Sequence, residues 1–548
     1  MKSLLKSSKI IIFAALFCAS AAPAALPSYD ELINAPKSLA KDYYINRYAQ
    51  EKKLNTTQLR TLRAQIYRYA GKIKTRFDKI IGPFILQSTC KGELKNLSQK
   101  CQRDTITQKY LSDLNKEQRE YLANYFKDRD YDLYVYIKSY DLGVDYAIKE
   151  GSDFAFFKHY YAAKDKNEML NLAKFSPALW ANISNKWAFV NILNDAVILG
   201  KNEVLRQQLL ALNPSRPHGE AAFLAGINAI LYNDEAKALR FFNQASRTPK
   251  NALNKDAALF WIYLINKDEN VLNSLAKSSD INMYSLYAHE MTDAKPFGVI
   301  VPNPKQLGLK NYDITDPFTW ERTKAEASKL KGGELVKFAA KFYTKSTLGE
   351  YCYLMERAYN YKKHYYPLPF MDVIGTTDAK RQALILALGR QESRFVPGSV
   401  STSYALGMMQ FMPFLARDIG HKKLKIEGFD ESDVFKPAIA YSFANYHLNY
   451  LEKYLQNPIF IAYAYNGGIG FTKRMLLEGK LFSKNSAYAK YEPFLSMELV
   501  PLSESRDYAK KVLANYIIYR AILGSSTKIS LFFESLMIPA DSDSFRSN

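Results

Sequence analysis

Cysteine and histidine are scarce in this chain of 548 residues, which holds only four cysteines and six histidines. The histidines, at positions 159, 218, 289, 364, 421 and 447, form no close cluster with acidic or cysteine ligands. Zinc and calcium sites need such ligands at short, recognisable spacings, and none is present. We therefore predict no metal, and no cofactor is indicated.

Long apolar runs are also missing, except near the N-terminus. The leader MKSLLKSSKIIIFAALFCASAAPAALPS places three lysines before an apolar run from Ile10 to Phe17, and small residues follow. This layout is typical of a signal peptide, which we place at 1–24 with cleavage within 21–25. An uncleaved anchor is the alternative, but the run is short for the roughly 20 residues that a bilayer requires. We therefore predict a periplasmic protein that does not span the membrane. Cys18 follows Phe17 rather than a small residue, which argues against lipidation.

Removal of the leader would leave three cysteines. Cys90 and Cys101 lie eleven residues apart, and a disulfide between them is plausible in an oxidising compartment. Cys352 would then remain free and, by default, buried.

Acidic residues are fewer than basic ones, and the net charge is +21. Without the three leader lysines it is +18, of which 366–548 contributes +4 from 21 basic and 17 acidic residues. The remaining +14 is densest in 37–79, and a basic face of this kind attracts polyanions. The alternative is that these basic residues simply form an ordinary solvated helix surface. We find no nucleic-acid recognition motif and predict no nucleic-acid partner.

Residues 26–300 carry apolar residues at helical spacing almost throughout. The clearest stretch, 219–277, contains four such segments separated by short polar links at 233–234 and 250–251. Paired short helices at near-constant spacing suggest an α-superhelix of tetratricopeptide-like units, although an irregular helical array would read almost the same way.

The stretch 378–413 holds the strongest functional candidate. Asp378 can cap a helix, and Leu384, Leu388 and Glu392 then share one face at four-residue spacing, ahead of a helix break at Pro397-Gly398. A carboxyl at the end of an apolar stripe loses water and keeps its proton longer, as a general acid must. The alternative is that Glu392 is simply a solvated glutamate at the end of a core helix.

Four blocks then support one another: RQES (390–393), GMMQFMP (407–413), AYAYNGG (462–468) and ELVPLSESRDYAKKVLANY (498–516). In this order they resemble the catalytic domain of soluble lytic transglycosylases, which have the goose-type lysozyme fold and cleave peptidoglycan. The sequence departs from the family pattern at Met408, Gly467, Tyr404 and Leu406, which puts the shape of the groove in question more than the activity.

The resemblance implies a largely α-helical chain with three domains after the leader. These are a superhelical domain at 25–300, a small helical linker domain at 301–365, and a lysozyme-like catalytic domain at 366–548. The proline-rich stretches at 299–304 and 365–370 mark the two boundaries.

The resemblance also assigns roles to individual residues. Glu392 would be catalytic, and eight residues would contact the substrate: Ser393, Ser401, Met409, Gln410, Met412, Tyr465, Asn466 and Glu504. Tyr463 and Tyr465 could equally be core aromatics, and Glu498 could be structural.

A single strong acid candidate fits a lytic transglycosylase better than a hydrolase, because hydrolytic glycosidases usually pair two carboxylates. Such an enzyme cleaves the MurNAc-β-1,4-GlcNAc bond without water and leaves 1,6-anhydroMurNAc ends. A lysozyme-like muramidase and a non-catalytic peptidoglycan-binding scaffold are the alternatives. Peptidoglycan strands and muropeptides are the expected ligands, and other cell-wall enzymes remain open as partners.

Overall fold

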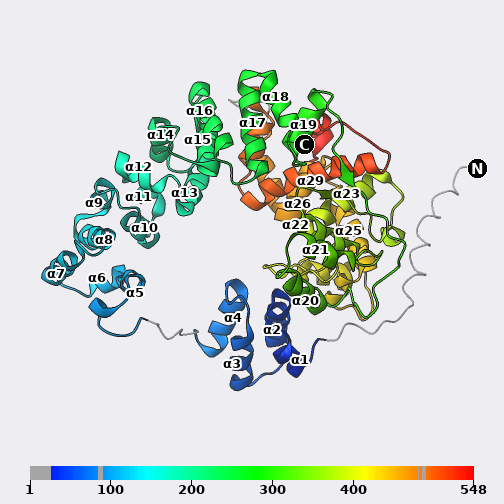
Figure 1. The fold of residues 1–548 in the computed structure, drawn as a ribbon, viewed down its shortest axis with the longest axis horizontal. Coiled ribbons are helices and arrows are strands. Elements are labelled where there is room, and N and C mark those ends of the chain that lie inside the picture. The colour runs from blue at the N-terminus through cyan, green and yellow to red at the C-terminus, as the bar shows by residue number, and fades with distance from the viewer. Residues whose placement is uncertain (1–25, 84–89, 479–480, 484–488, 548) are drawn as a thin grey trace, which may run out of the picture. The chain divides into compact units, whose positions relative to one another are not determined.

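The computed structural model describes residues 26–83, 90–478, 481–483 and 489–547. The predicted signal peptide and its cleavage site lie outside these ranges. Helices dominate the described residues, so the predicted largely α-helical fold class is confirmed (Figure 1). None of the helices in these ranges is long and apolar enough to cross a membrane.

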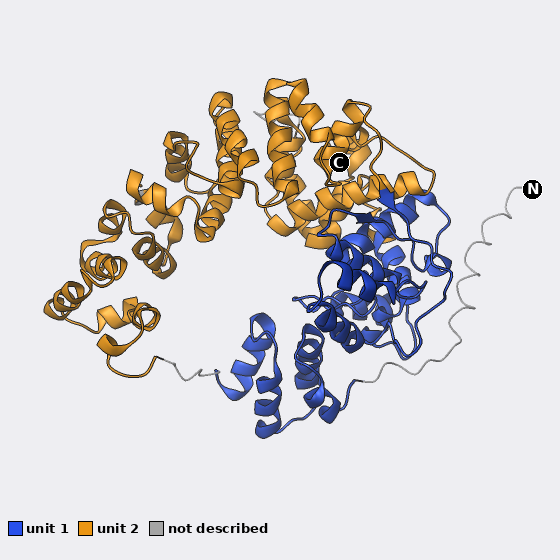
Figure 2. Cartoon of the chain, viewed as in Figure 1, with its two compact units in different colours: residues 1–83, 299–448 blue, residues 84–298, 449–548 orange. Residues whose placement is uncertain are grey.

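The chain divides into two compact units that do not follow sequence order (Figure 2). The first contains 26–83 and 299–448, and the second contains the rest of the described chain up to 547. The predicted domain boundaries at 300 and 365 remain predictions, and each unit is described separately below.

The first unit opens with four helices, which are α1 (Tyr29–Asn34), α2 (Leu39–Glu51), α3 (Thr56–Gln65) and α4 (Gly71–Ile81). Its second segment contains β1 (Val299–Ile300), α20 (Pro317–Ala327), α21 (Gly332–Ala340), α22 (Leu348–Ala358), β2 (His364–Tyr365), α23 (Ala379–Ser393), α24 (Pro413–Arg417) and most of α25 (Pro437–Leu451). The two short strands pair in parallel, with Val299 opposite His364.

Polar contacts from α2 explain why residues 26–83 belong to this unit. The Tyr43 hydroxyl donates to Glu431 at 2.7 Å, and an Arg47 guanidinium nitrogen donates to Asp430 at 2.9 Å. The Tyr44 ring stacks on Phe318 of α20 with 5.5 Å between centroids. These side chains are buried or nearly so. They fix α2 against α20 and against the segment 430–431, which both lie far from it in the sequence.

The second unit begins with an array of short helices. They are α5 (Gln99–Thr105), α6 (Gln108–Ser112), α7 (Lys116–Phe126), α8 (Tyr131–Leu142), α9 (Val144–Lys149), α10 (Asp153–Ala162), α11 (Lys166–Leu172), α12 (Pro177–Ile183), α13 (Trp187–Ile198), α14 (Glu203–Ala211), α15 (Gly219–Leu231), α16 (Glu235–Arg247), α17 (Ala252–Asn266), α18 (Glu269–Ala276) and α19 (Met283–Met291). Helices α15 to α18 match the four segments predicted in 219–277, and each packs on its neighbours in the chain.

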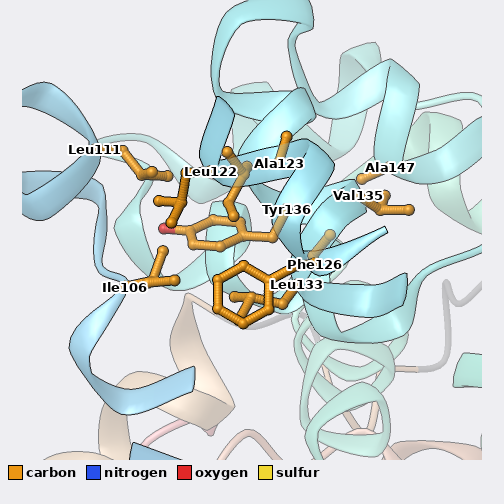
Figure 3. Packing of buried hydrophobic residues seen from close by; sticks show 11 residues of the cluster. Ile106, Leu111, Leu122, Ala123, Phe126, Leu133, Val135, Tyr136 and Ala147 are labelled. Carbon is orange, nitrogen blue, oxygen red and sulfur yellow. The ribbon is translucent and has the colours of Figure 1, made fainter. Parts of the chain in front are cut away.

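One apolar core in this array is formed by α7, α8 and α9 together with residues just before them. Ile106, Leu111, Phe126, Leu133 and Tyr136 converge there and are essentially without solvent exposure (Figure 3). Upstream of this core, Cys90 and Cys101 are joined by a disulfide with 5.3 Å between their Cα atoms, and Cys352 of the first unit is free and buried.

The second unit ends with six further helices, which are α26 (Pro458–Gly467), α27 (Ile469–Leu477), α28 (Phe494–Glu498), α29 (Ser503–Ile522), α30 (Ser530–Leu536) and α31 (Pro539–Ser542). The end of the array packs against them. Tyr284 of α19 donates to the buried Glu498 at 2.8 Å, and Lys510 pairs with the same carboxylate at 2.6 Å. Glu498 is therefore a structural residue within this unit.

Candidate functional site

Glu392 lies in the last turn of α23. The Asp378 carboxylate caps this helix by accepting from the backbone N–H groups of Lys380 and Arg381, as the sequence predicts. Leu384 and Leu388 are buried, whereas Glu392 is partly exposed. The apolar stripe thus ends in a carboxyl at the boundary between core and solvent.

The helix ends at Ser393, ahead of the predicted break at Pro397-Gly398. Arg394 and Phe395 adopt left-handed backbone conformations with φ of 56° and 65°. The buried Phe395 ring folds back under α23, where a Cβ on Gly389 would lie only 2.7 Å from it. Glycine is therefore needed at position 389 for the turn that follows Glu392.

The two arginines that flank Glu392 are anchored to one buried carboxylate. Glu356 of α22 accepts from Arg390 at 2.6 Å and from the Arg394 guanidinium, and it also accepts from the Tyr365 backbone N–H at 3.3 Å. Burial alone would raise the pKa of Glu356, but the two guanidinium groups outweigh it and lower that pKa. This clamp holds the backbone on both sides of Glu392, and we did not predict it from the sequence.

A short loop, 399–412, lies next to the end of α23. The Ser393 hydroxyl connects the two by donating to the Met408 carbonyl at 2.8 Å. Isolated bridges join Val400 to Leu406 and Leu406 to Phe411, so the loop doubles back on itself. The apolar block that begins at Gly407 is thus a turn, and the helix starts only at Pro413.

The predicted substrate residues of this loop differ in exposure. Ser401, Gln410 and Met412 are partly exposed, whereas Met409 is fully buried beneath them. The Ser401 hydroxyl accepts from the Ala405 backbone N–H at 3.0 Å, and the Gln410 amide donates to the Gly407 carbonyl at 2.8 Å. These bonds preorganise the loop but leave the Met409 side chain away from its surface.

Some of the positive-φ residues of the chain lie close in sequence to Glu392. Besides Arg394 and Phe395, both Tyr404 and Gln410 have positive φ, at 65° and 53°. Each such non-glycine residue costs free energy, and residues of this kind cluster at ligand-binding and catalytic sites.

Gly407 tests how tightly the loop is built. Its φ is +76°, and an added Cβ would lie 2.4 Å from the Val434 carbonyl oxygen. We expect Gly407→Ala to lower the free energy of unfolding by about 2–4 kcal/mol, because it combines a left-handed conformation with a backbone clash. Gly428→Ala is the matched control, since its φ is +65° but nothing lies within 4 Å. It should lose only about 1–2 kcal/mol in the same denaturation assay. Equal losses would show that the clash is relieved without cost.

The other predicted site residues lie in the second unit. Asn466, near the end of α26, donates to the exposed Glu504 at 3.3 Å and accepts from the Ser505 hydroxyl at 2.6 Å. Tyr465 is partly exposed, whereas Tyr463 is fully buried. Helix α26 ends at Gly467, and Gly468 follows with φ of 87°. The structure thus brings Asn466 and Glu504 together, and separately Glu392, Ser393 and the 399–412 loop.

Within the described residues, no group of three or more histidine, cysteine, aspartate or glutamate side chains is placed to hold a metal ion. The buried carboxylates Glu431 and Asp433 of the first unit are committed to ion pairs with Arg417 and Lys436. Glu350 of α22 is buried too, and burial raises its pKa to about 8, whereas Glu392 is partly exposed.

The region that contains Glu392 matches a known protein family. Residues 372–487 match the family model described as the transglycosylase SLT domain, so the resemblance drawn from the four sequence blocks is confirmed. The match includes Glu392, the 399–412 loop and Tyr465.

Curated relatives carry the same description. The soluble lytic murein transglycosylase of Escherichia coli K12 is 27% identical over 225 residues, which is 40% of this chain and 33% of the relative. A Haemophilus influenzae protein assigned provisionally to the same group is 34% identical over 149 residues, or 27% of this chain and 23% of the relative. The matches thus span a third or less of the length of these relatives.

Two solved structures are similar over most of the chain. The lytic transglycosylase Slt of Pseudomonas aeruginosa covers 90% of this chain and 83% of its own, at 13% identity and a TM-score of 0.45. The 70 kDa soluble lytic transglycosylase of Escherichia coli covers 94% and 92%, at 16% identity and a TM-score of 0.38.

Proposed function

We propose that this chain, whose residues 372–487 resemble a transglycosylase SLT domain, is a periplasmic peptidoglycan lytic transglycosylase for cell-wall turnover and remodelling. It would cleave the MurNAc-β-1,4-GlcNAc bond without water and leave 1,6-anhydroMurNAc ends. The observation that carries the proposal is the position of Glu392, a partly exposed carboxyl at the end of a buried helix inside the matched region.

Glu392 would act first as an acid and then as a base. As an acid it gives its proton to the glycosidic oxygen, so the bond from that oxygen to the anomeric carbon of MurNAc breaks. The N-acetyl carbonyl oxygen of the same sugar stabilises the cationic anomeric carbon. The ionised Glu392 then takes the proton from the 6-hydroxyl group as its oxygen bonds to the anomeric carbon. Glu392 regains its proton, and no water is consumed.

The remaining site residues would bind and orient the glycan. Gln410, Ser401 and Met412 present one partly exposed surface beside Glu392, and Asn466 and Glu504 form a second polar group. We infer that both groups contact sugar or peptide portions of the substrate. The buried Met409 would support the loop from below rather than touch the ligand.

Incubating the full mature chain with purified sacculi tests this proposal, with products resolved by mass. We expect muropeptides that end in 1,6-anhydroMurNAc, each lighter by one water than its hydrolytic counterpart. Reducing ends instead would identify a muramidase, and no release of muropeptides would identify a binding scaffold. Either result would overturn the proposal.

Replacing Tyr465 by phenylalanine should lower the turnover rate roughly three- to tenfold without changing the melting temperature. Loss of one hydrogen bond from a neutral hydroxyl costs about 0.5–1.5 kcal/mol, and a bond completed in the transition state is lost from turnover. Tyr463→Phe is the matched control, because the Tyr463 hydroxyl is buried and makes no hydrogen bond within the described chain. It should leave turnover unchanged. A lowered melting temperature with unchanged turnover for Tyr465→Phe would assign that ring to the core instead.

A further inference from the structure

A pocket far along the chain from Glu392 lies on the helical array of the second unit. It has a volume of about 690 Å³ and is lined by residues of α5, α6, α8 and α10 and by the residue before α13. Phe154, Phe157 and Tyr161 of α10 supply aromatic walls. Tyr136, whose ring belongs to the core shown in Figure 3, also lines it, so the pocket rests on a packed base.

The polar lining is predominantly basic, with Arg103, Lys109, Lys158 and Lys186 against two aspartates. Most of these charges are already paired. Arg103 binds Asp130 at 2.7 Å and Asp132 at 3.4 Å, and Lys186 lies 3.1 Å from Asp153. Lys109 is solvent-exposed and lies 3.6 Å from Asp113.

Lys158 is the exception among these cations. None of the ion pairs in the described ranges includes it, and its ammonium group donates to the Arg103 backbone carbonyl at 2.8 Å. It also lies over the Phe154 and Tyr136 rings, at 5.3 and 5.6 Å from their centroids. Burial lowers the pKa of Lys158, and the more distant charge of Asp104 offsets this only in part, so the ammonium group is held partly out of water with no carboxylate in ion-pair contact.

A carboxylate on a partly apolar ligand would suit both Lys158 and the aromatic walls. Its oxygens would pair with the Lys158 ammonium, and its apolar part would cover the faces of Phe157 and Tyr161. We propose that this pocket binds the stem peptide of peptidoglycan through a peptide carboxylate held by Lys158. This inference rests on the proposed function, since that function makes peptidoglycan the polymer that the chain meets.

The size and chemistry of the pocket favour the peptide over the glycan. Pockets of about 300–1,000 Å³ enclose small molecules, which fits a few peptide residues but not a continuous sugar strand. The acidic groups of peptidoglycan are its peptide carboxylates and, where the stem peptide has been removed, the lactyl carboxylate, whereas neutral sugars offer no anionic partner for the Lys158 ammonium group.

Calorimetric titration of the full mature chain carrying Glu392→Gln tests the inference without turnover. The probe is the free tetrapeptide alanyl-γ-glutamyl-diaminopimelyl-alanine, which lacks sugar. We expect saturable binding that Lys158→Met weakens about 10- to 100-fold, because a charged hydrogen bond is lost. Lys158→Arg should retain the affinity within a few-fold. Lys138→Met is the control, since Lys138 lies on α8, pairs with Glu120 and does not line the pocket; it should bind as the parent does.

Several results would overturn the inference. These are no saturable tetrapeptide binding, equal binding by the parent and Lys158→Met, and an equal loss with Lys138→Met. N-acetylmuramic acid binding as tightly as the tetrapeptide would assign the pocket to the lactyl carboxylate. Chitotetraose binding that Tyr161→Ala abolishes would make it a neutral sugar subsite. Sacculus cleavage by the chain with Glu392 intact is scored separately, so failure of this site and failure of the proposed function are distinguishable.

Discussion

Glu392→Gln is expected to abolish peptidoglycan cleavage while the protein stays folded and still binds sacculi. Glutamine keeps the shape of the side chain but has no proton to give to the glycosidic oxygen and cannot take one from the 6-hydroxyl group. General acid–base catalysis typically contributes about 10²–10⁴-fold, and loss of both steps should cost at least that much. The measurement is the rate of muropeptide release from sacculi, normalised to folded protein by the thermal transition.

Glu427→Gln is the matched control for this substitution. Glu427 is an exposed glutamate of the same compact unit, so its replacement removes the same charge away from the proposed site. We expect wild-type turnover and stability from it. Muropeptide release by Glu392→Gln at a rate near that of the wild type would assign the chemistry to another residue.

The local features of the fold could be predicted from the sequence because their causes are local. The helices of 219–277 have apolar residues at regular spacing and polar residues between them, and the structure has helices there. Asp378 is an N-cap in both the prediction and the structure, and Gly468 takes the positive φ expected after a helix. Each of these depends on residues within a few positions of one another.

Long-range association could not be predicted, because no local pattern encodes it. Arg47 and Asp430 are 383 residues apart, and either charge alone is compatible with an ordinary solvated surface. The end of α23 is a related case. A proline–glycine pair is a known helix breaker, yet the helix ends earlier because the buried Phe395 ring turns the chain back under Gly389. Tertiary packing, rather than local preference, decides both.

The candidate site was predictable in part. The stripe of Leu384, Leu388 and Glu392 correctly indicates a carboxyl at the edge of the core. The burial of Met409 was not predictable, since Met412 has the same chemistry and lies three residues away but is partly exposed. Glu356 was missed because it lies on another helix. Arg390 and Arg394, four residues apart at the end of a buried helix, could nevertheless have indicated that a buried anion lies nearby.

Glu356→Leu should cause the largest loss of stability among the substitutions considered. Glu356 is 3% exposed and holds both Arg390 and Arg394, so leucine would leave two guanidinium groups without their carboxylate partner. Removing one partner of a buried ion pair typically costs about 3–5 kcal/mol. We expect a loss of this size in urea unfolding, together with faster hydrogen exchange in the last turn of α23. Glu334→Leu, at an exposed position on α21, is the matched control and should change neither.

The pH dependence provides a second test of the same clamp. Because the native pKa of Glu356 is lowered, its contribution to stability is complete above the pKa of an unfolded glutamate and is lost as the pH falls through the lowered native value. The wild-type chain should therefore lose stability in acid more steeply than Glu356→Gln, which has no proton to take up at this position. The difference between the two unfolding free energies should shrink as the pH falls below about 4. A difference that stays constant across that range would show that the two arginines do not depend on the charge of Glu356, and the proposed electrostatic hold on the backbone around Glu392 would then be wrong.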